Sequence, residues 1–300
     1  MRGRCLVLSL AVAASLFAQR QPARPALPQI PNSVQAAADL IYATYGARRL
    51  HLDLYLPKSG AGPFPAVVYI HAGGWRIGNK LAFRRQAVHM ATRGFVGACI
   101  EYRLLGEAKY PAAVHDAKAA VRWLRAHAAQ YRINPNKVGA AGGSSGGHLA
   151  AMLGTTHRVK ELEGGGGNPG FSSRVQVVAA FNPALDLVEL GKKGIRTGGQ
   201  FNPVFQFLGV RYEAQPQLYA EASPITHVAR DSAPFLLLHG TDDEAVPYQQ
   251  SVEMLNRLKQ ARVRADLFTA QGAAHGFYQG ILWYEETLKK MEEFFTSTLK

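Results

Sequence analysis

The sequence predicts an α/β fold with a mostly parallel central sheet and helices on both faces. Short apolar runs typical of buried parallel strands alternate with amphipathic helical segments across residues 39–300. Hydrophobic residues make up 47% of the 300-residue chain, enough for a large core and too many for a disordered chain. Two cysteines are too few for a disulfide-rich scaffold.

Each element follows from a local pattern of apolar residues. Leucines at every second position of 50–56 alternate with polar residues, which predicts a half-buried strand that Pro57 ends. Residues 66–70 are continuously apolar, as in a strand buried on both faces. By the same reasoning, further strands are expected at 95–101, 137–141, 175–181, 235–239 and 264–269, and helices at 81–92, 112–130, 146–153, 248–260 and 283–300.

The first 18 residues are typical of an export signal. Arg2 and Arg4 precede an apolar stretch from Leu6 to Ala18 that is short for a membrane span. We expect a secreted or periplasmic protein with no stable membrane association after cleavage, and an uncleaved anchor is the alternative. Residues 19–38, with prolines at every third position from Pro22 to Pro31, predict an extended tether, so the folded domain is expected at 39–300.

Residues 182–230 interrupt the alternation of strands and helices. The segment is rich in glycine, glutamine and aromatic residues. We interpret it as a small cap-like insertion that serves as a lid or substrate wall, and an ordinary surface excursion is the alternative.

The basic charge of the chain does not indicate a nucleic-acid partner. The formal net charge is +13, but four arginines and no acidic residue precede Asp39, so the folded part carries +9. Its Lys and Arg residues are scattered through the helices without interleaved aromatic residues. We therefore expect no nucleic-acid partner.

The segment Gly142–His148 suggests a nucleophile at a turn between a strand and a helix. A serine at such a tight turn needs small residues two positions before and two after it. This segment satisfies the pattern in two overlapping registers, on Ser144 and on Ser145, and the residues alone leave both open. Gly-x-Ser-x-Gly is also a weak signal in a chain with 30 glycines.

Three further motifs each follow a predicted strand. Gly73 and Gly74, in His71–Trp75, can bring backbone N–H groups close to an oxyanion. A carboxylate within 239–247 can orient a histidine, and His275 can act as a general base. Ligands of open α/β sheets bind beyond the carboxyl ends of the strands, so an oxyanion loop, Ser, Asp and His in this order predict one active site.

With these motifs, the sequence resembles the α/β-hydrolase superfamily, in its carboxylesterase and feruloyl-esterase-like (BD-FAE-like) branch near the hormone-sensitive-lipase-like enzymes. The similarity extends beyond the serine motif over nearly all of the chain after the signal. It includes Leu52-Asp53-Leu54-Tyr55-Leu56-Pro57, Glu101-Tyr102-Arg103-Leu104, Tyr110-Pro111-Ala112-Ala113 and Asp116-Ala117-Lys118-Ala119-Ala120-Val121-Arg122-Trp123-Leu124.

The resemblance implies a role for each site residue. The family motif G-x-S-x-G-G-H-L-A puts the nucleophile at Ser144 and leaves Ser145 to donate its backbone N–H. The family's acid falls on Asp243 rather than Asp242, and its loop histidine falls on His275. Gly73, Gly74 and Ser145 would form the oxyanion hole. Ala72 replaces the first glycine of the family's oxyanion loop, which matters if position 72 needs a positive φ.

The implied activity is hydrolysis of a carboxylic ester, free or linked to a polysaccharide, through an acyl-enzyme. Short acyl, acetyl and feruloyl esters are the expected substrates. No metal and no cofactor is expected, and Trp75 either lines the substrate pocket or packs in the core. A serine peptidase of the prolyl-oligopeptidase type, which would lack its propeller domain here, and a non-catalytic binding protein on a hydrolase fold are the alternatives.

Overall fold

A single mixed sheet organises the computed structural model, which describes residues 29–193 and 203–300. Its strand order is β1-β2-β4-β3-β5-β6-β7-β8, where β1 and β2 run antiparallel to their neighbours and the strands from β4 through β8 are parallel. The strands are β1 (Val34–Tyr45), β2 (Arg48–Pro57), β3 (Phe64–Ile70), β4 (Val96–Ile100), β5 (Ile133–Gly143), β6 (Val177–Phe181), β7 (Phe235–Gly240) and β8 (Ala265–Ala270). The predicted mostly parallel α/β architecture is confirmed.

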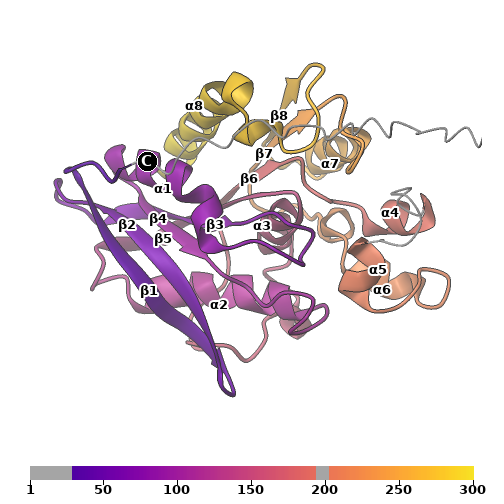
Figure 1. The fold of residues 1–300 in the computed structure, drawn as a ribbon, viewed down its shortest axis with the longest axis horizontal. Helices are drawn as coiled ribbons and strands as arrows, with labels where there is room; N and C mark the ends of the chain where they lie inside the picture. Colours follow the sequence, from indigo (N-terminus) through magenta and orange to yellow (C-terminus); the bar gives the residue numbers. More distant parts are fainter. Residues whose placement is uncertain (1–28, 194–202) are drawn as a thin grey trace, which may run out of the picture.

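Helices cover both faces of this sheet (Figure 1). On one face α2 (Ala112–Ala126), α3 (Ser145–Thr155) and α7 (Gln249–Gln260) pack on one apolar cluster. On the other face α1 (Arg84–Thr92) and α8 (Ile281–Leu299) pack on a second cluster. Alternate side chains of a strand point to opposite faces, so the strands at the centre of the sheet contribute to both clusters, and their buried parts are apolar.

The folded domain begins earlier than the predicted Asp39. Residues 34–38, assigned from the sequence to the tether, form the first part of β1, and the expected export signal lies outside the described residues. β1 is an edge strand with mostly exposed side chains, so it lacks the apolar alternation that marks a strand in sequence. Its register with β2 shifts between Ala37 and Leu40, and Asp39 has φ +56° there.

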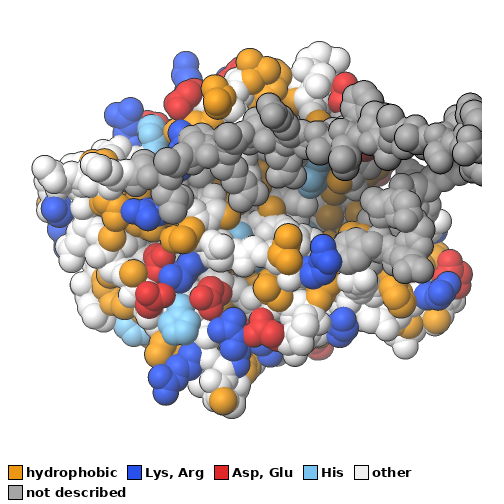
Figure 2. Space-filling view, viewed as in Figure 1, with side chains coloured by type: hydrophobic (Ala, Val, Ile, Leu, Met, Phe, Trp, Pro, Cys, Tyr) orange, Lys and Arg blue, Asp and Glu red, His pale blue; other side chains and the backbone are white. Residues whose placement is uncertain are grey.

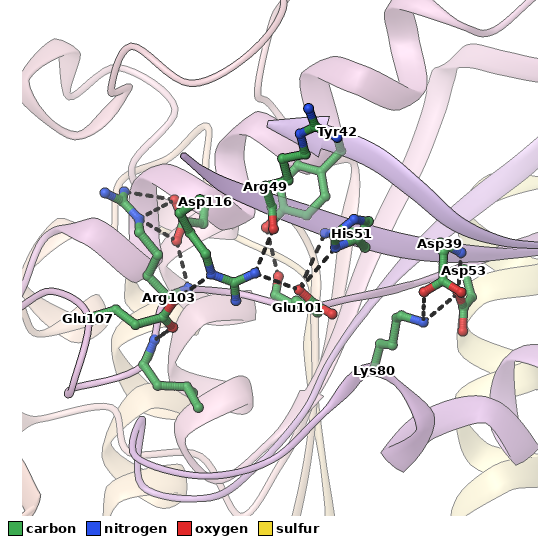
Figure 3. Close-up of polar contacts among 12 residues, drawn as sticks. Asp39, Tyr42, Arg49, His51, Asp53, Lys80, Glu101, Arg103, Glu107 and Asp116 are labelled. Atoms are coloured by element: carbon green, nitrogen blue, oxygen red, sulfur yellow. Dashed lines mark hydrogen bonds and ion pairs between the residues drawn. The ribbon is translucent and has the colours of Figure 1, made fainter. Parts of the chain in front are cut away.

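Polar contacts hold β1 to the rest of the sheet. The Lys80 ammonium lies 2.8 Å from both the Asp39 and the Asp53 carboxylates, and the Asp39 N–H donates to Asp53 (Figure 3). Nearby, Arg103 pairs with the fully buried Asp116 at 2.8 Å (Figure 3). The contacts of Asp39 connect the edge strand β1 to Asp53 of β2 and to Lys80, and the Arg103–Asp116 pair connects the residues that follow β4 to α2.

The 182–230 segment contains three short helices in its described part, α4 (Leu187–Lys193), α5 (Pro203–Leu208) and α6 (Pro216–Glu221). In Figure 1 they lie together on the side of the molecule away from β1. Among the helices of the described residues, none has the length and apolar composition that crossing a membrane requires.

Candidate active site

Six of the seven predicted site residues line one pocket of about 870 Å³ at the carboxyl ends of the parallel strands. The seventh, Asp243, is buried and contacts His275 without lining the pocket. Three of the pocket's segments directly follow β3, β5 and β6, and a fourth follows β8. This location follows from the topology, because the loops after parallel strands gather at one edge of the sheet. Figure 2 shows basic and acidic side chains interspersed at the lower left of the face that it draws, as on an ordinary solvated surface.

Ser144 occupies the turn between β5 and α3 in a strained conformation. Its φ of +53° and ψ of −118° are rare for a residue other than glycine. A Cβ at Gly142 would come within 2.3 Å of the Gly146 carbonyl oxygen, and a Cβ at Gly146 would come within 2.2 Å of the Ile70 oxygen. The Ser144 N–H donates to the Phe181 oxygen at 2.8 Å, which anchors the turn to β6.

The structure brings Ser144, His275 and Asp243 into one hydrogen-bonded line. Ser144 Oγ lies 2.9 Å from His275 Nε2, and His275 Nδ1 lies 2.7 Å from Asp243 Oδ2. The serine hydroxyl can donate to Nε2 when Nδ1–H donates to the carboxylate. This is the tautomer in which the imidazole can accept the serine proton.

Asp243 is buried and holds its negative charge through hydrogen bonds. Its Oδ1 accepts the N–H groups of Ala245 and Val246 at 2.9 and 2.8 Å, and its Oδ2 lies between His275 and His239. Burial raises the pKa of this carboxyl, but the hydrogen bonds from His239, His275 and Val246 outweigh burial and lower the pKa to about 2. Asp243 therefore stays ionised at neutral pH and can stabilise an imidazolium.

The two alternative residues lie elsewhere. The Ser145 side chain is buried, with Oγ 3.5 Å from the Tyr102 hydroxyl, and within the described residues it makes no hydrogen bond to His275. Asp242 is exposed and accepts a hydrogen bond from the Thr241 hydroxyl at 3.0 Å. The geometry thus places Ser144 and Asp243, and not their neighbours, against His275.

Gly73, Gly74 and Ser145 line the pocket that also holds Ser144 and His275. Within the described residues, none of their three backbone N–H groups donates to a protein acceptor. Gly73 has φ +129° and a Cβ there would come within 1.9 Å of the Ile77 oxygen, so only glycine fits. Ala72 is not among the residues with positive φ, which explains why alanine is accommodated in this loop.

Trp75 both lines the pocket and packs in the core. Only 3% of its surface is exposed, and its ring stacks on Phe207 of α5 with centroids 4.3 Å apart. Its Nε1–H donates to His148 Nδ1 at 3.3 Å, and His148 Nε2–H donates to the Ala222 carbonyl at 2.8 Å. Trp75 and His148 therefore join the loop of Gly73 and Gly74 to the 182–230 segment.

Two residues near the site have no role in the sequence motifs. Asn182 directly follows β6, is fully buried, and places its Nδ2 3.3 Å from both ring nitrogens of His275. His239 Nε2 lies 3.2 Å from Asp243 Oδ2, and its Nδ1 accepts from the Ser251 hydroxyl at 2.7 Å. In the sequence, one feature could have identified both residues as candidates for the site: each is polar and stands at the carboxyl end of a predicted strand. The described residues contain no group of three or more His, Cys, Asp or Glu side chains arranged to hold a metal ion.

Comparisons with known proteins point to one family. The BD-FAE family model matches residues 52–258. Two curated relatives are the probable carboxylic ester hydrolase LipM of Mycobacterium tuberculosis, 31% identical over 74% of this chain and 51% of its own length, and the probable isoprenylcysteine alpha-carbonyl methylesterase ICMEL1 of Arabidopsis thaliana, 27% identical over 76% of this chain and 48% of its own. The chain spans about half the length of these curated relatives.

Solved esterase structures share the fold over nearly their whole length. A truncated carbohydrate esterase from gut microbiota superposes with a TM-score of 0.78 at 28% identity, covering 88% of this chain and 96% of that one. The apo form of esterase 2 from Thermogutta terrifontis gives a TM-score of 0.74 at 32% identity, covering 90% and 96%. The predicted α/β-hydrolase fold is confirmed.

Proposed function

Because the chain belongs to the BD-FAE family of α/β-hydrolases, we propose that it is a serine carboxylic-ester hydrolase with Ser144 as nucleophile. The observation that carries the proposal is the hydrogen-bonded line from Ser144 Oγ through His275 to Asp243, at 2.9 and 2.7 Å. This arrangement activates a serine hydroxyl for attack on an acyl carbon.

Acylation begins when Ser144 Oγ attacks the ester carbonyl carbon and His275 Nε2 takes the hydroxyl proton. Asp243, ionised and held by two backbone N–H groups, stabilises the imidazolium that forms. The bond from the acyl carbon to the alcohol oxygen then breaks, and the imidazolium returns its proton to that oxygen. The products are a free alcohol and an acyl group bonded to Ser144.

The oxyanion of each tetrahedral intermediate would bind the N–H groups of Gly73, Gly74 and Ser145. Support comes from their position in the pocket and from the lack of a protein acceptor for them among the described residues. Donors that are fixed before the reaction stabilise the developing charge without reorganisation. Loss of one such donor typically lowers kcat by about 10²- to 10³-fold.

Deacylation repeats these steps with water as the nucleophile. His275 accepts a proton from the attacking water, and the intermediate expels Ser144 Oγ, which regains the proton. The carboxylic acid leaves and the free enzyme is restored. Each step moves protons between Ser144, His275, water and substrate, so its chemistry requires no metal or cofactor.

The proposal also covers the acyl group of the substrate and the cellular location of the protein. Acetyl, other short acyl and feruloyl groups are the proposed acyl halves of the substrate, supported by the family resemblance. Export to the periplasm or the medium is supported by the positive and apolar segments of residues 1–18.

Hydrolysis of p-nitrophenyl acetate tests the activity. We expect Ser144→Ala to lower kcat/KM by about 10³-fold or more. Ser145→Ala is the matched control, and we expect it to retain most of the activity because the Ser145 side chain is buried away from His275. Unchanged activity in Ser144→Ala, or loss in Ser145→Ala alone, would contradict the assignment. A wild-type preference for prolyl peptide anilides over esters would identify a peptidase instead.

A further inference from the structure

Two apolar side chains at the mouth of the pocket are unusually exposed. Ile281 and Leu282 form the start of α8, and 78% and 82% of their surfaces are accessible. Among the large apolar side chains of the described residues, these two are the most exposed, and both line the pocket that holds Ser144. Apolar groups gathered at a pocket mouth typically contact an apolar ligand.

These side chains belong to a continuous apolar wall. Phe277 and Trp283 also line the pocket, and their rings meet edge to face with centroids 6.3 Å apart. Trp283 packs in the same way on Phe268 of β8, at 6.1 Å. These ring contacts hold Trp283, the residue that follows Leu282 in α8, against β8. We call the four residues Phe277, Ile281, Leu282 and Trp283 the apolar shelf.

The shelf continues directly from His275 along the chain. His275 and the segment from Gly276 to Trp283 line the pocket without interruption. A second apolar wall comes from the 182–230 segment, where Leu190, Pro203 and Val204 line the same pocket. The described lining residues therefore form two apolar walls, and only one of them carries the general base.

The chemistry assigns the wall beside His275 to the alcohol half of the ester. The imidazolium Nε2–H must reach the alcohol oxygen as the ester bond breaks, so the leaving group lies next to His275. The group attached to that oxygen then extends along the residues that follow His275. This step rests on the proposed function, in which His275 is the general acid of acylation.

We infer that the apolar shelf binds the alcohol half of the substrate, and that this half is an alkyl or aryl group. The described lining of the pocket contains Arg76 but no Asp or Glu, so the carboxylates that commonly bind sugar hydroxyls are missing from it. Burial of Ile281 and Leu282 against an apolar alcohol supplies binding energy in proportion to the area covered. The specificity of the enzyme thus lies partly in the leaving group.

Hexyl acetate and methyl acetate test this inference, because their leaving groups have similar basicity and differ in apolar length. The variant is Ile281→Ser combined with Leu282→Ser. We expect the ratio of kcat/KM for hexyl acetate to that for methyl acetate to fall by about tenfold. Ile41→Ser is the matched control, since Ile41 is an exposed apolar residue of β1 that does not line the pocket, and it should leave the ratio unchanged.

Methyl hexanoate distinguishes the two halves of the ester. The double variant should leave the ratio of methyl hexanoate to methyl acetate unchanged. A fall in that ratio instead would place the acyl chain on the shelf and overturn the inference. An unchanged hexyl ratio with an altered oligomeric state would assign the shelf to contact between copies of the chain and would overturn it too. Either failure leaves the proposed function intact, because loss of activity in Ser144→Ala tests that function separately.

Discussion

Asn182 lies over the imidazole of His275. Its Nδ2 is 3.3 Å from both ring nitrogens, while Asp243 and Ser144 occupy the in-plane directions of those nitrogens. An atom equally distant from both nitrogens, and in neither in-plane direction, rests on a face of the ring. Asn182 Oδ1 also accepts the Gly276 N–H at 3.4 Å, so one side chain contacts both the ring and its loop.

We therefore expect Asn182 to act as a positioning residue for His275. Asn182 has φ +36°, which glycine and aspartate tolerate, so Asn182→Gly and Asn182→Asp separate the amide from the backbone conformation. Asn182→Gly should lower kcat about tenfold with little change in KM, because a misoriented base affects the reaction more than binding. It should also weaken the downfield proton NMR signal of the His275–Asp243 hydrogen bond.

The control for Asn182 keeps the contact to the loop. Asn182→Asp retains an oxygen for the Gly276 N–H, so it should keep that NMR signal. If Asn182→Gly lowered thermal stability but left kcat and the NMR signal unchanged, the role of Asn182 would be structural only.

We expect replacement of Gly73 in the oxyanion loop by alanine to lower activity far more than the same replacement of Gly106. A Cβ at Gly73 would collide with the Ile77 oxygen, so Gly73→Ala must displace the N–H groups of the loop. We expect kcat for p-nitrophenyl acetate to fall about 10²-fold or more. Gly106 has open space at its Cβ position and no positive φ, and Gly106→Ala should leave kcat unchanged. Equal activity in the two variants would remove Gly73 from the oxyanion hole.

The sequence predicted the parts of the molecule that depend on local pattern. The buried strands are continuous apolar runs, and the loops of Gly73, Ser144, Asp243 and His275 each follow one, so their meeting at one edge is a consequence of parallel topology. The strand β1 is not among the predicted strands because its sequence lacks an apolar pattern, and its pairing with β2 is what holds it in the sheet. The position of Asn182 over His275 depends on two loops 93 residues apart, which no local pattern encodes.

The buried His148 makes stability depend on pH. Burial, partly opposed by the hydrogen bond to the Ala222 carbonyl, lowers the pKa of His148 from 6.5 to about 4. Between these values the unfolded chain binds a proton that the folded protein does not, so the free energy of unfolding falls as the pH drops from 6.5 to 4. Above pH 6.5 the contribution of the neutral, buried His148 to the free energy of unfolding is fully present.

Replacing His148 isolates this effect. His148→Asn keeps a polar side chain beside Trp75 and has no proton to gain. Urea unfolding at pH 7 and pH 4.5 should show a smaller loss of stability on acidification in the variant than in the wild type. Burial also lowers the pKa of His71 to about 4. His71 therefore makes the free energy of unfolding depend on pH in the variant as well as in the wild type. The same pH dependence in the two proteins would contradict the role assigned to His148.

Arg122 anchors the glycine-rich loop that contains residues 163–167. Its guanidinium is buried and donates to the backbone oxygens of Glu163, Gly166 and Gly167 and to the Glu163 carboxylate. Arg122→Met would remove the guanidinium donor from the three backbone oxygens, while the Glu163 carboxylate keeps its contacts with Lys118 and Ser173. We expect a loss of about 1–3 kcal/mol in the free energy of unfolding. Arg257→Met, on the exposed side of α7, should change it by less than about 0.5 kcal/mol. Similar urea midpoints for the two variants would refute the anchoring role.

Covalent trapping of the nucleophile tests the assignment of Ser144. A fluorophosphonate reacts with an activated serine and leaves a stable adduct that intact-protein mass spectrometry detects. We expect one adduct per chain in the wild type and in Ser145→Ala, none in Ser144→Ala, and slow formation in His275→Ala. An adduct that persists in Ser144→Ala, or one that disappears only in Ser145→Ala, would contradict the assignment of Ser144 as the nucleophile.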